Sequence, residues 1–308
     1  MGKTAFIFPG QGSQYVGMGR DFYEKSEICR QVIDAASKES GYDLKHLMFE
    51  ENDELDITKY TQIAMLADEA AILCKLEEDG IRPDVAAGLS LGEYAALIAS
   101  GAMEKEDAFR LITVRGRLMQ EAVPTGGAMT AVLGLEAEKI EEICEQTEGI
   151  VSIANYNCPG QIVITGESAA VNAASEQLKA AGAKRCMPLK VSGPFHSELL
   201  EEAGKKLAAE MEQTEVKDAR IPYVANVTAQ YVTEAKEVKA LLEKQISSPV
   251  RWQQSVEAMI ADGVDVFVEI GPKKSLTKFI QKINPKVTAY HIDTWSDYKE
   301  VVSKLQES

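Results

Sequence analysis

Short apolar runs alternate along the chain with longer segments that have helical periodicity. Residues 60–80 are an example, because apolar side chains recur there every three or four positions until Gly80 ends the pattern. Further helices are predicted over residues 104–122, 255–262 and 275–283. Strands are predicted over residues 4–8, 84–87, 221–226, 264–270 and 286–292. Strands separated by helical crossovers indicate a three-layer α/β fold around a mostly parallel sheet.

One region departs from this alternation. Between Gly127 and Val191 the pattern predicts a βαββαβ unit, with elements over residues 128–133, 136–147, 151–155, 161–165, 169–181 and 184–190. Glycine and proline at residues 124–127 and 192–194 interrupt the chain on both sides of this unit. We therefore expect a ferredoxin-like subdomain at residues 126–192, inserted into a larger catalytic domain formed by residues 1–125 and 193–308.

Composition and charge narrow the classes of function. The 308 residues are 45% hydrophobic and 26% charged, which is typical of a globular protein and excludes a disordered or fibrous chain. A net charge of −15 argues against nucleic acid as a partner. No apolar run is long enough for a membrane span or a signal peptide. The five cysteines form no CxxC pair, so we expect reduced thiols, no metal site and a cytoplasmic protein.

The most informative local motif is Gly88-Leu89-Ser90-Leu91-Gly92, which follows a predicted strand and precedes a predicted helix. This G-x-S-x-G context is typical of a nucleophile elbow and of an α/β-hydrolase-like core. Small flanking residues allow a sharp turn that exposes the serine oxygen, and the N–H of Leu91 is placed to donate to an oxyanion. The alternative is a glycine-rich turn whose serine only caps the helix.

A serine nucleophile needs a base, and the chain has only three histidines. His46 is expected on the surface and His291 inside the last predicted strand. His196 follows the predicted insertion, where a cleft between two domains would form, so it is the candidate base. A purely structural histidine is the alternative at each position.

Two further segments are candidates for the site. Residues 8–14 follow the first strand and are rich in glycine, but Tyr15 replaces the third glycine of a dinucleotide fingerprint, so this loop is expected to present a backbone N–H toward the serine. Arg115 follows an apolar stripe in a predicted helix. From the residues alone, an arginine extending to the surface is the favoured interpretation.

Taken together, the chain resembles the malonyl-CoA:acyl carrier protein transacylases, within the acyltransferases of fatty-acid and polyketide synthesis. The resemblance covers nearly the whole chain and rests on motifs at residues 8–14, 88–97, 115–124, 154–161, 192–199, 245–252 and 269–272. It implies that Ser90 is the nucleophile and His196 its base. It also implies that the backbone N–H groups of Gln11 and Leu91 form the oxyanion hole, and that the main-chain carbonyl of Gln245 orients the base.

The same resemblance implies how the substrate is bound. Arg115 would bind the free carboxylate of the malonyl group, and Asn157 would line the cleft. This chain departs from the family at Leu89, where a histidine usually precedes the nucleophile. The departure bears on acyl selectivity and rate, not on the class of reaction.

The implied reaction is ping-pong transfer of a malonyl group from malonyl-CoA to the phosphopantetheine thiol of acyl carrier protein, through a seryl ester in fatty acid biosynthesis. No permanently bound cofactor, no membrane and a monomer are expected. Alternatives are malonyl loading of a polyketide carrier, an esterase or thioesterase that uses His291, and a non-catalytic homologue that only binds the carrier. A stoichiometric burst with malonyl-CoA would distinguish a transferase from a hydrolase.

Overall fold

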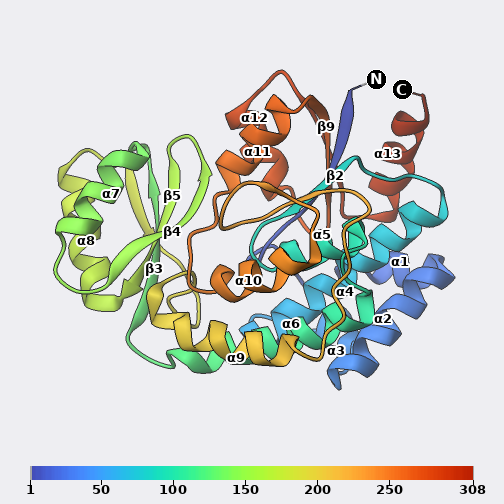
Figure 1. Cartoon of the computed structure of the whole chain (residues 1–308), viewed down its shortest axis with the longest axis horizontal. Helices are drawn as coiled ribbons and strands as arrows, with labels where there is room; N and C mark the ends of the chain where they lie inside the picture. Colours follow the sequence, from blue (N-terminus) through green and yellow to red (C-terminus); the bar gives the residue numbers. More distant parts are fainter. Residues whose placement is uncertain (1, 308) are drawn as a thin grey trace.

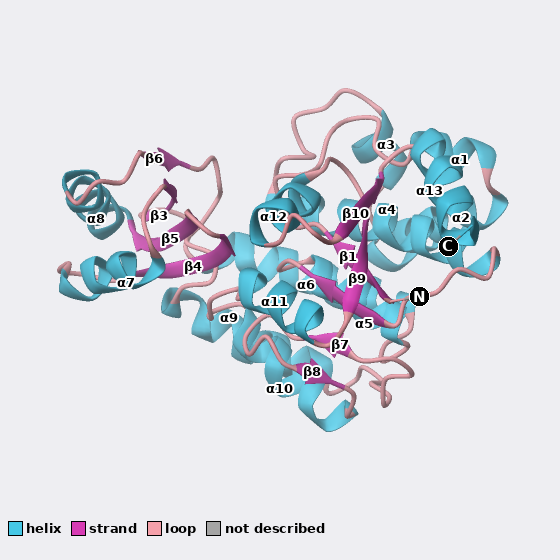
Figure 2. Cartoon of the chain, turned by 90° about the horizontal axis from the view of Figure 1, so that it is seen from above, coloured by secondary structure: helices cyan, strands magenta, loops and turns pink. Residues whose placement is uncertain are grey.

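The computed structural model describes residues 2–307 and has two lobes of unequal size (Figures 1 and 2). In Figure 1 the smaller lobe lies on the left and contains β3, β4, β5, α7 and α8, whereas the larger lobe holds both ends of the chain. α9 (Glu201–Met211) and the short 3-10 helix η1 (Glu198–Leu200) follow the smaller lobe and return the chain to the larger one.

The larger lobe is built on a six-stranded sheet with the order β10-β9-β1-β2-β7-β8. Neighbouring strands are parallel except for β8, which pairs antiparallel with β7. The strands are β1 (Lys3–Phe8), β2 (Val85–Gly88), β7 (Tyr223–Val224), β8 (Tyr231–Val232), β9 (Val264–Ile270) and β10 (Thr288–Ile292). The predicted mostly parallel sheet is confirmed.

Helices cover both faces of this sheet, which explains why its strands are apolar at successive positions. Ala5 and Ile7 pack in one buried cluster together with α11 (Trp252–Ala261) and α12 (Ser275–Ile283). Phe6 and Phe8 point the other way, into a larger cluster. That cluster includes residues of α1 (Arg20–Lys25), α2 (Glu27–Ser40), α3 (Leu44–Phe49), α4 (Thr58–Glu78), α5 (Gly92–Ser100), α6 (Lys105–Ala122), α9, α10 (Ala235–Gln245) and α13 (Trp295–Glu307).

The smaller lobe is an antiparallel sheet of four strands with the order β4-β5-β3-β6. Its elements follow the predicted βαββαβ sequence: β3 (Gly127–Leu133), α7 (Ala137–Gln146), β4 (Val151–Cys158), β5 (Gln161–Glu167), α8 (Ser168–Ala180) and β6 (Arg185–Pro188). Both helices pack on the sheet in a separate apolar cluster. A parallel bridge between Asn155 and Val250 joins this sheet to the larger lobe.

Several boundaries differ from the sequence-based expectation, and those of β7 and β4 are examples. The strand expected over residues 221–226 is reduced to β7 (Tyr223–Val224), because the chain pairs with β2 at only two positions before it turns. β4 continues to Cys158, beyond the expected end at residue 155, since its pairing with β5 extends across two irregularities in register. Among residues 2–307, no helix is both long and apolar enough to cross a bilayer.

The turn from β2 to α5 depends on two glycines that approach other backbone segments closely. A Cβ atom on Gly92 would lie 2.3 Å from the carbonyl oxygen of Phe8, and one on Gly88 would lie 2.0 Å from the carbonyl carbon of Gly92. Backbone atoms cannot yield as a flexible side chain does. The helix therefore sits against the end of β1 only because both positions lack a side chain.

We expect Gly92→Ala to lower the free energy of unfolding by about 1–3 kcal/mol, the usual cost of overpacking. Urea denaturation monitored by circular dichroism measures this difference. Gly193→Ala is the matched control, because a Cβ atom there meets its nearest neighbour at an ordinary 3.4 Å. Equal midpoints for Gly92→Ala and the unaltered protein would contradict this account of the turn.

Candidate active site

Ser90 lies in the turn between β2 and α5, in a backbone conformation that non-glycine residues rarely adopt. Its φ angle is 56°, in the left-handed region. Asn226 stabilises this turn from both sides. Its Oδ1 accepts a hydrogen bond from the Ser90 N–H at 2.7 Å, and its Nδ2 donates to the Gly88 carbonyl at 2.6 Å. The serine therefore projects from a fixed backbone, as the motif predicts.

His196 is the histidine that the structure brings to Ser90. Its Nε2 lies 2.8 Å from the serine Oγ. Its Nδ1 faces two carbonyl oxygens, that of Gln245 at 2.9 Å and that of Ser248 at 3.1 Å. Because carbonyls only accept, Nδ1 carries the proton and Nε2 is left to accept the hydroxyl proton of Ser90. The Gln245 carbonyl is the one named in the sequence analysis, and Ser248 adds a second acceptor.

Burial keeps this imidazole neutral. His196 is 3% exposed, and desolvation, with a smaller contribution from the charge of Arg115, lowers its pKa to about 4. The two carbonyl acceptors act in the opposite direction but do not offset burial. At neutral pH the ring is therefore in the form that accepts a proton.

Arg115 is fully buried beside the serine, so the interpretation of an arginine reaching the surface is wrong. Its Nη2 donates to the Ser90 Oγ at 3.0 Å and to the Gln245 Oε1 at 2.9 Å, while Nη1 donates to the Gln62 Oε1 at 2.7 Å. No carboxylate among residues 2–307 forms an ion pair with it. A buried guanidinium held only by neutral groups is a strong binding point for an anion.

The backbone N–H groups of Gln11 and Leu91 are free to act on a bound substrate. Both residues line the cavity that contains Ser90, and neither N–H donates to another residue within the described part of the chain. Leu91 also precedes the first turn of α5, whose N-terminal end favours negative charge. The N–H of Ser90 itself is occupied by Asn226, so it is not available as a third donor.

The cavity at Ser90 lies between the two lobes and has a volume of about 240 Å³. The smaller lobe contributes Asn155 and Asn157 to the lining of this cavity. Leu89 also lines this cavity and packs close to Gly10. An apolar side chain therefore stands where the family usually has a histidine.

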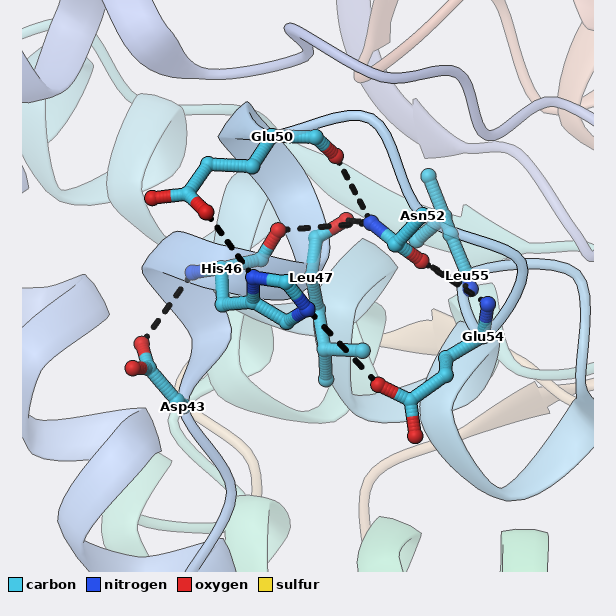
Figure 3. A network of polar contacts seen from close by, with 7 residues as sticks. All are labelled: Asp43, His46, Leu47, Glu50, Asn52, Glu54 and Leu55. Carbon is cyan, nitrogen blue, oxygen red and sulfur yellow. Dashed lines mark hydrogen bonds and ion pairs between the residues drawn. The ribbon is translucent and has the colours of Figure 1, made fainter.

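The other two histidines lie outside the site. His46 is on the surface in α3, where its ring contacts Glu50 at 2.9 Å and Glu54 at 3.8 Å (Figure 3). His291 is on β10 and is not among the residues that line the cavity at Ser90. The esterase alternative, which assigns the base to His291, is therefore not supported by the geometry.

Four groups that contact Ser90 or Arg115, directly or through another side chain, were not anticipated. They are the side chains of Gln62, Asn226 and Gln245 and the carboxyl group of Glu93, all buried. A polar residue inside a helix that is buried on all sides, such as Gln62 in α4, could have indicated a residue that supports the site. Asn226 lies more than a hundred residues from Ser90 in sequence, so no local pattern could connect them.

The part of the chain that the structure describes contains no cluster of side chains suited to a metal ion.

We expect the histidine signals to titrate separately in NMR spectra. His196 should stay neutral until the pH approaches 4, because burial lowers its pKa, whereas Glu50 raises the pKa of His46 above its ordinary value near 6.5. The ring C–H shifts of the three histidines measure this, with His46→Gln used for assignment. A His196 midpoint at or above 6.5 would contradict the buried neutral ring.

Comparison with known proteins identifies the family to which the chain belongs. The acyl transferase domain family matches residues 5–292. The malonyl CoA-acyl carrier protein transacylase of Bacillus subtilis is 43% identical over 312 aligned positions, covering 100% of this chain and 98% of the relative. The enzyme of the same name from Staphylococcus aureus strain MW2 is 43% identical over 97% of this chain and 98% of its own length.

Solved structures extend the similarity to the whole fold. The malonyl CoA-acyl carrier protein transacylase of Clostridium perfringens has a TM-score of 0.95 at 41% identity, covering 99% of this chain and 98% of that structure. A protein described as MCAT from Streptococcus pneumoniae has a TM-score of 0.94 at 47% identity, covering 98% and 100%. Because the family model matches residues 5–292 and relatives at 43% identity cover the chain along its length, this chain belongs to the acyl transferase family.

Proposed function

We propose that the chain transfers a malonyl group from malonyl-CoA to the phosphopantetheine thiol of acyl carrier protein, and that Ser90 carries the group in between. The malonyl CoA-acyl carrier protein transacylases that match the entire chain support this substrate pair. Fatty acid synthesis is the favoured context. A carrier of polyketide synthesis is the second candidate acceptor, because a 39% identical transacylase has been solved with a type II polyketide synthase acyl carrier protein.

In the first half-reaction the Ser90 oxygen attacks the thioester carbonyl while the Nε2 of His196 takes its proton. The N–H groups of Gln11 and Leu91 stabilise the negative oxygen of the tetrahedral intermediate. The C–S bond then breaks, and the protonated imidazole returns the proton to the leaving thiolate of CoA. In the second half-reaction the carrier thiol gives its proton to His196, attacks the seryl ester and removes the malonyl group, which restores the Ser90 hydroxyl.

The observation that carries this proposal is the position of Arg115. A fully buried guanidinium without an ionic partner lies 3.0 Å from the nucleophile, so an acyl group that ends in a carboxylate can bind it while its thioester reaches Ser90. The planar guanidinium suits bidentate binding of a carboxylate. An acetyl group offers no charge to this cation. The site therefore favours malonyl over acetyl groups.

The finer architecture is also part of the proposal. We assign residues 126–192 to an inserted ferredoxin-like subdomain, which its strand order supports, and residues 1–125 and 193–308 to an α/β-hydrolase-like catalytic domain. We further propose a cytoplasmic monomer. The five cysteines, all free of disulfides, support a reducing compartment.

The direct test is mass spectrometry of the intact protein mixed with malonyl-CoA. One malonyl group should be added per chain in a burst, and Ser90→Ala should remove the addition completely. His196→Ala should slow acylation by about 10²–10⁴-fold, the usual contribution of a general base. Continuous release of malonate without an acylated form would contradict transferase activity and favour a hydrolase. The absence of any acylation would favour a non-catalytic homologue.

Arg115→Ala should slow acylation by malonyl-CoA by roughly 10²–10³-fold, because removing a buried charge that binds a carboxylate costs several kcal/mol. Acylation by acetyl-CoA should fall much less. Rapid-quench rates with the two thioesters measure this ratio. Arg117→Ala is the matched control, since Arg117 lies on the same helix but is exposed. Equal losses with both thioesters would contradict the role of Arg115.

A further inference from the structure

The side chain of Gln245 contacts two of the groups used in the proposed reaction. Its Oε1 accepts from Arg115 at 2.9 Å, and its Nε2 donates to the Ser90 carbonyl at 2.8 Å. Its Nε2 also donates to the Oε2 of Glu93 at 2.6 Å. This carboxamide must keep its oxygen toward the guanidinium, because a flipped amide would face Arg115 with a donor and Glu93 with an acceptor.

Glu93 lies beneath this carboxamide in the first turn of α5 and is 1% exposed. The same Oε2 atom that accepts from Gln245 also accepts from the backbone N–H of Asn226 at 3.3 Å. Asn226 in turn holds the Ser90 turn through its side chain. The Oε2 of Glu93 therefore connects Asn226, which holds the Ser90 turn, with Gln245, which accepts a hydrogen bond from Arg115.

We propose that Glu93 is a positioning residue for malonyl selectivity, acting through Gln245 to hold Arg115 in the orientation that binds the substrate carboxylate. This inference rests on the proposed function. Glu93 touches neither Ser90 nor Arg115 with its side chain at hydrogen-bonding distance, so its effect on the reaction passes through the two amides. Losing the shared acceptor leaves a buried N–H of Gln245 and one of Asn226 without partners, which favours rearrangement of both.

The position of Glu93 behind Gln245 also affects the electrostatics of Arg115. Arg115 is buried with neutral acceptors around it, and a carboxylate in direct contact would compete with the substrate. Glu93 acts on Arg115 through its charge while the Gln245 carboxamide keeps the two groups apart. The cation is thus partly balanced on the side that faces Gln245, while its Nη2 lies 3.0 Å from the Ser90 Oγ, and Ser90 lines the cavity. Burial raises the pKa of Glu93 to about 7, so the acceptor oxygen matters more here than a full negative charge.

The experiment compares Glu93→Met, which keeps the size of the side chain and removes the acceptor, with Glu93→Gln, which keeps one carbonyl oxygen for both bonds. Acylation rates with malonyl-CoA and acetyl-CoA are measured for each. Glu93→Met should slow malonyl acylation about 10–100-fold, the scale expected when a reacting or binding group is misplaced. Its loss with acetyl-CoA should be clearly smaller. Glu93→Gln should stay within about threefold of the unaltered protein in both assays, since both hydrogen bonds are retained.

Two controls separate positioning from simple destabilisation. Glu69→Met makes the same substitution at another fully buried glutamate, one whose carboxyl oxygens have no partner, and it should leave the malonyl-to-acetyl ratio unchanged. In an Arg115→Ala background, adding Glu93→Met should not change that ratio further. Gln245→Met keeps the backbone carbonyl that contacts His196, and it should reproduce the loss of selectivity if Glu93→Met fails to fold.

Three results would overturn the inference. The first is an unchanged malonyl-to-acetyl ratio in Glu93→Met, or in Gln245→Met where that variant replaces it. The second is a Glu93→Gln variant that is as impaired as Glu93→Met, and the third is a further change of the ratio when Glu93→Met is added to Arg115→Ala. Each of these leaves acylation of the unaltered protein at Ser90 intact. A failure of the inference is therefore distinguishable from a failure of the proposed function.

Discussion

The site depends on the strained turn at Ser90, because every other group is placed relative to it. A left-handed conformation costs a non-glycine residue about 1–2 kcal/mol, so the surrounding structure must hold it. Contact between α5 and the end of β1, allowed by Gly88 and Gly92, and the two hydrogen bonds of Asn226 do so. Since β1 and β2 are neighbours in the sheet, the loop after β1 brings Gln11 to the same cavity.

Arg115 and His196 have linked electrostatic roles. The guanidinium disfavours a second positive charge beside it, which helps to keep the imidazole neutral, and its Nη2 also donates a hydrogen bond to the Ser90 Oγ. In the proposed reaction the same cation binds the substrate carboxylate. In that reaction one buried charge therefore both keeps the base unprotonated and favours an acyl group that ends in a carboxylate. Its burial is tolerated because Gln62 and Gln245 accept its hydrogen bonds.

Much of the fold could be predicted from the sequence where a pattern is local. The βαββαβ unit and the turn at Ser90 follow from hydrophobic periodicity and from glycine spacing, and both agree with the structure. Arg115 shows the limit of such reasoning. Its position beside an apolar stripe indicated a surface arginine, whereas the side chain is buried. Only the resemblance to a family implied a place in the substrate site. The amides that support it come from distant helices, and spacing along the chain carries no information about such contacts.

The bridge between Val250 and the smaller lobe has a mechanical consequence. Val250 accepts a hydrogen bond from the N–H of Tyr156 and donates one to the carbonyl of Ala154, so this segment behaves as an added strand of the smaller sheet. Two residues earlier, Ser248 offers its carbonyl to His196. A tilt of one lobe relative to the other would thus displace the Ser248 carbonyl that contacts the His196 ring. A change in the width of the cleft between the lobes would therefore also change the orientation of the His196 imidazole.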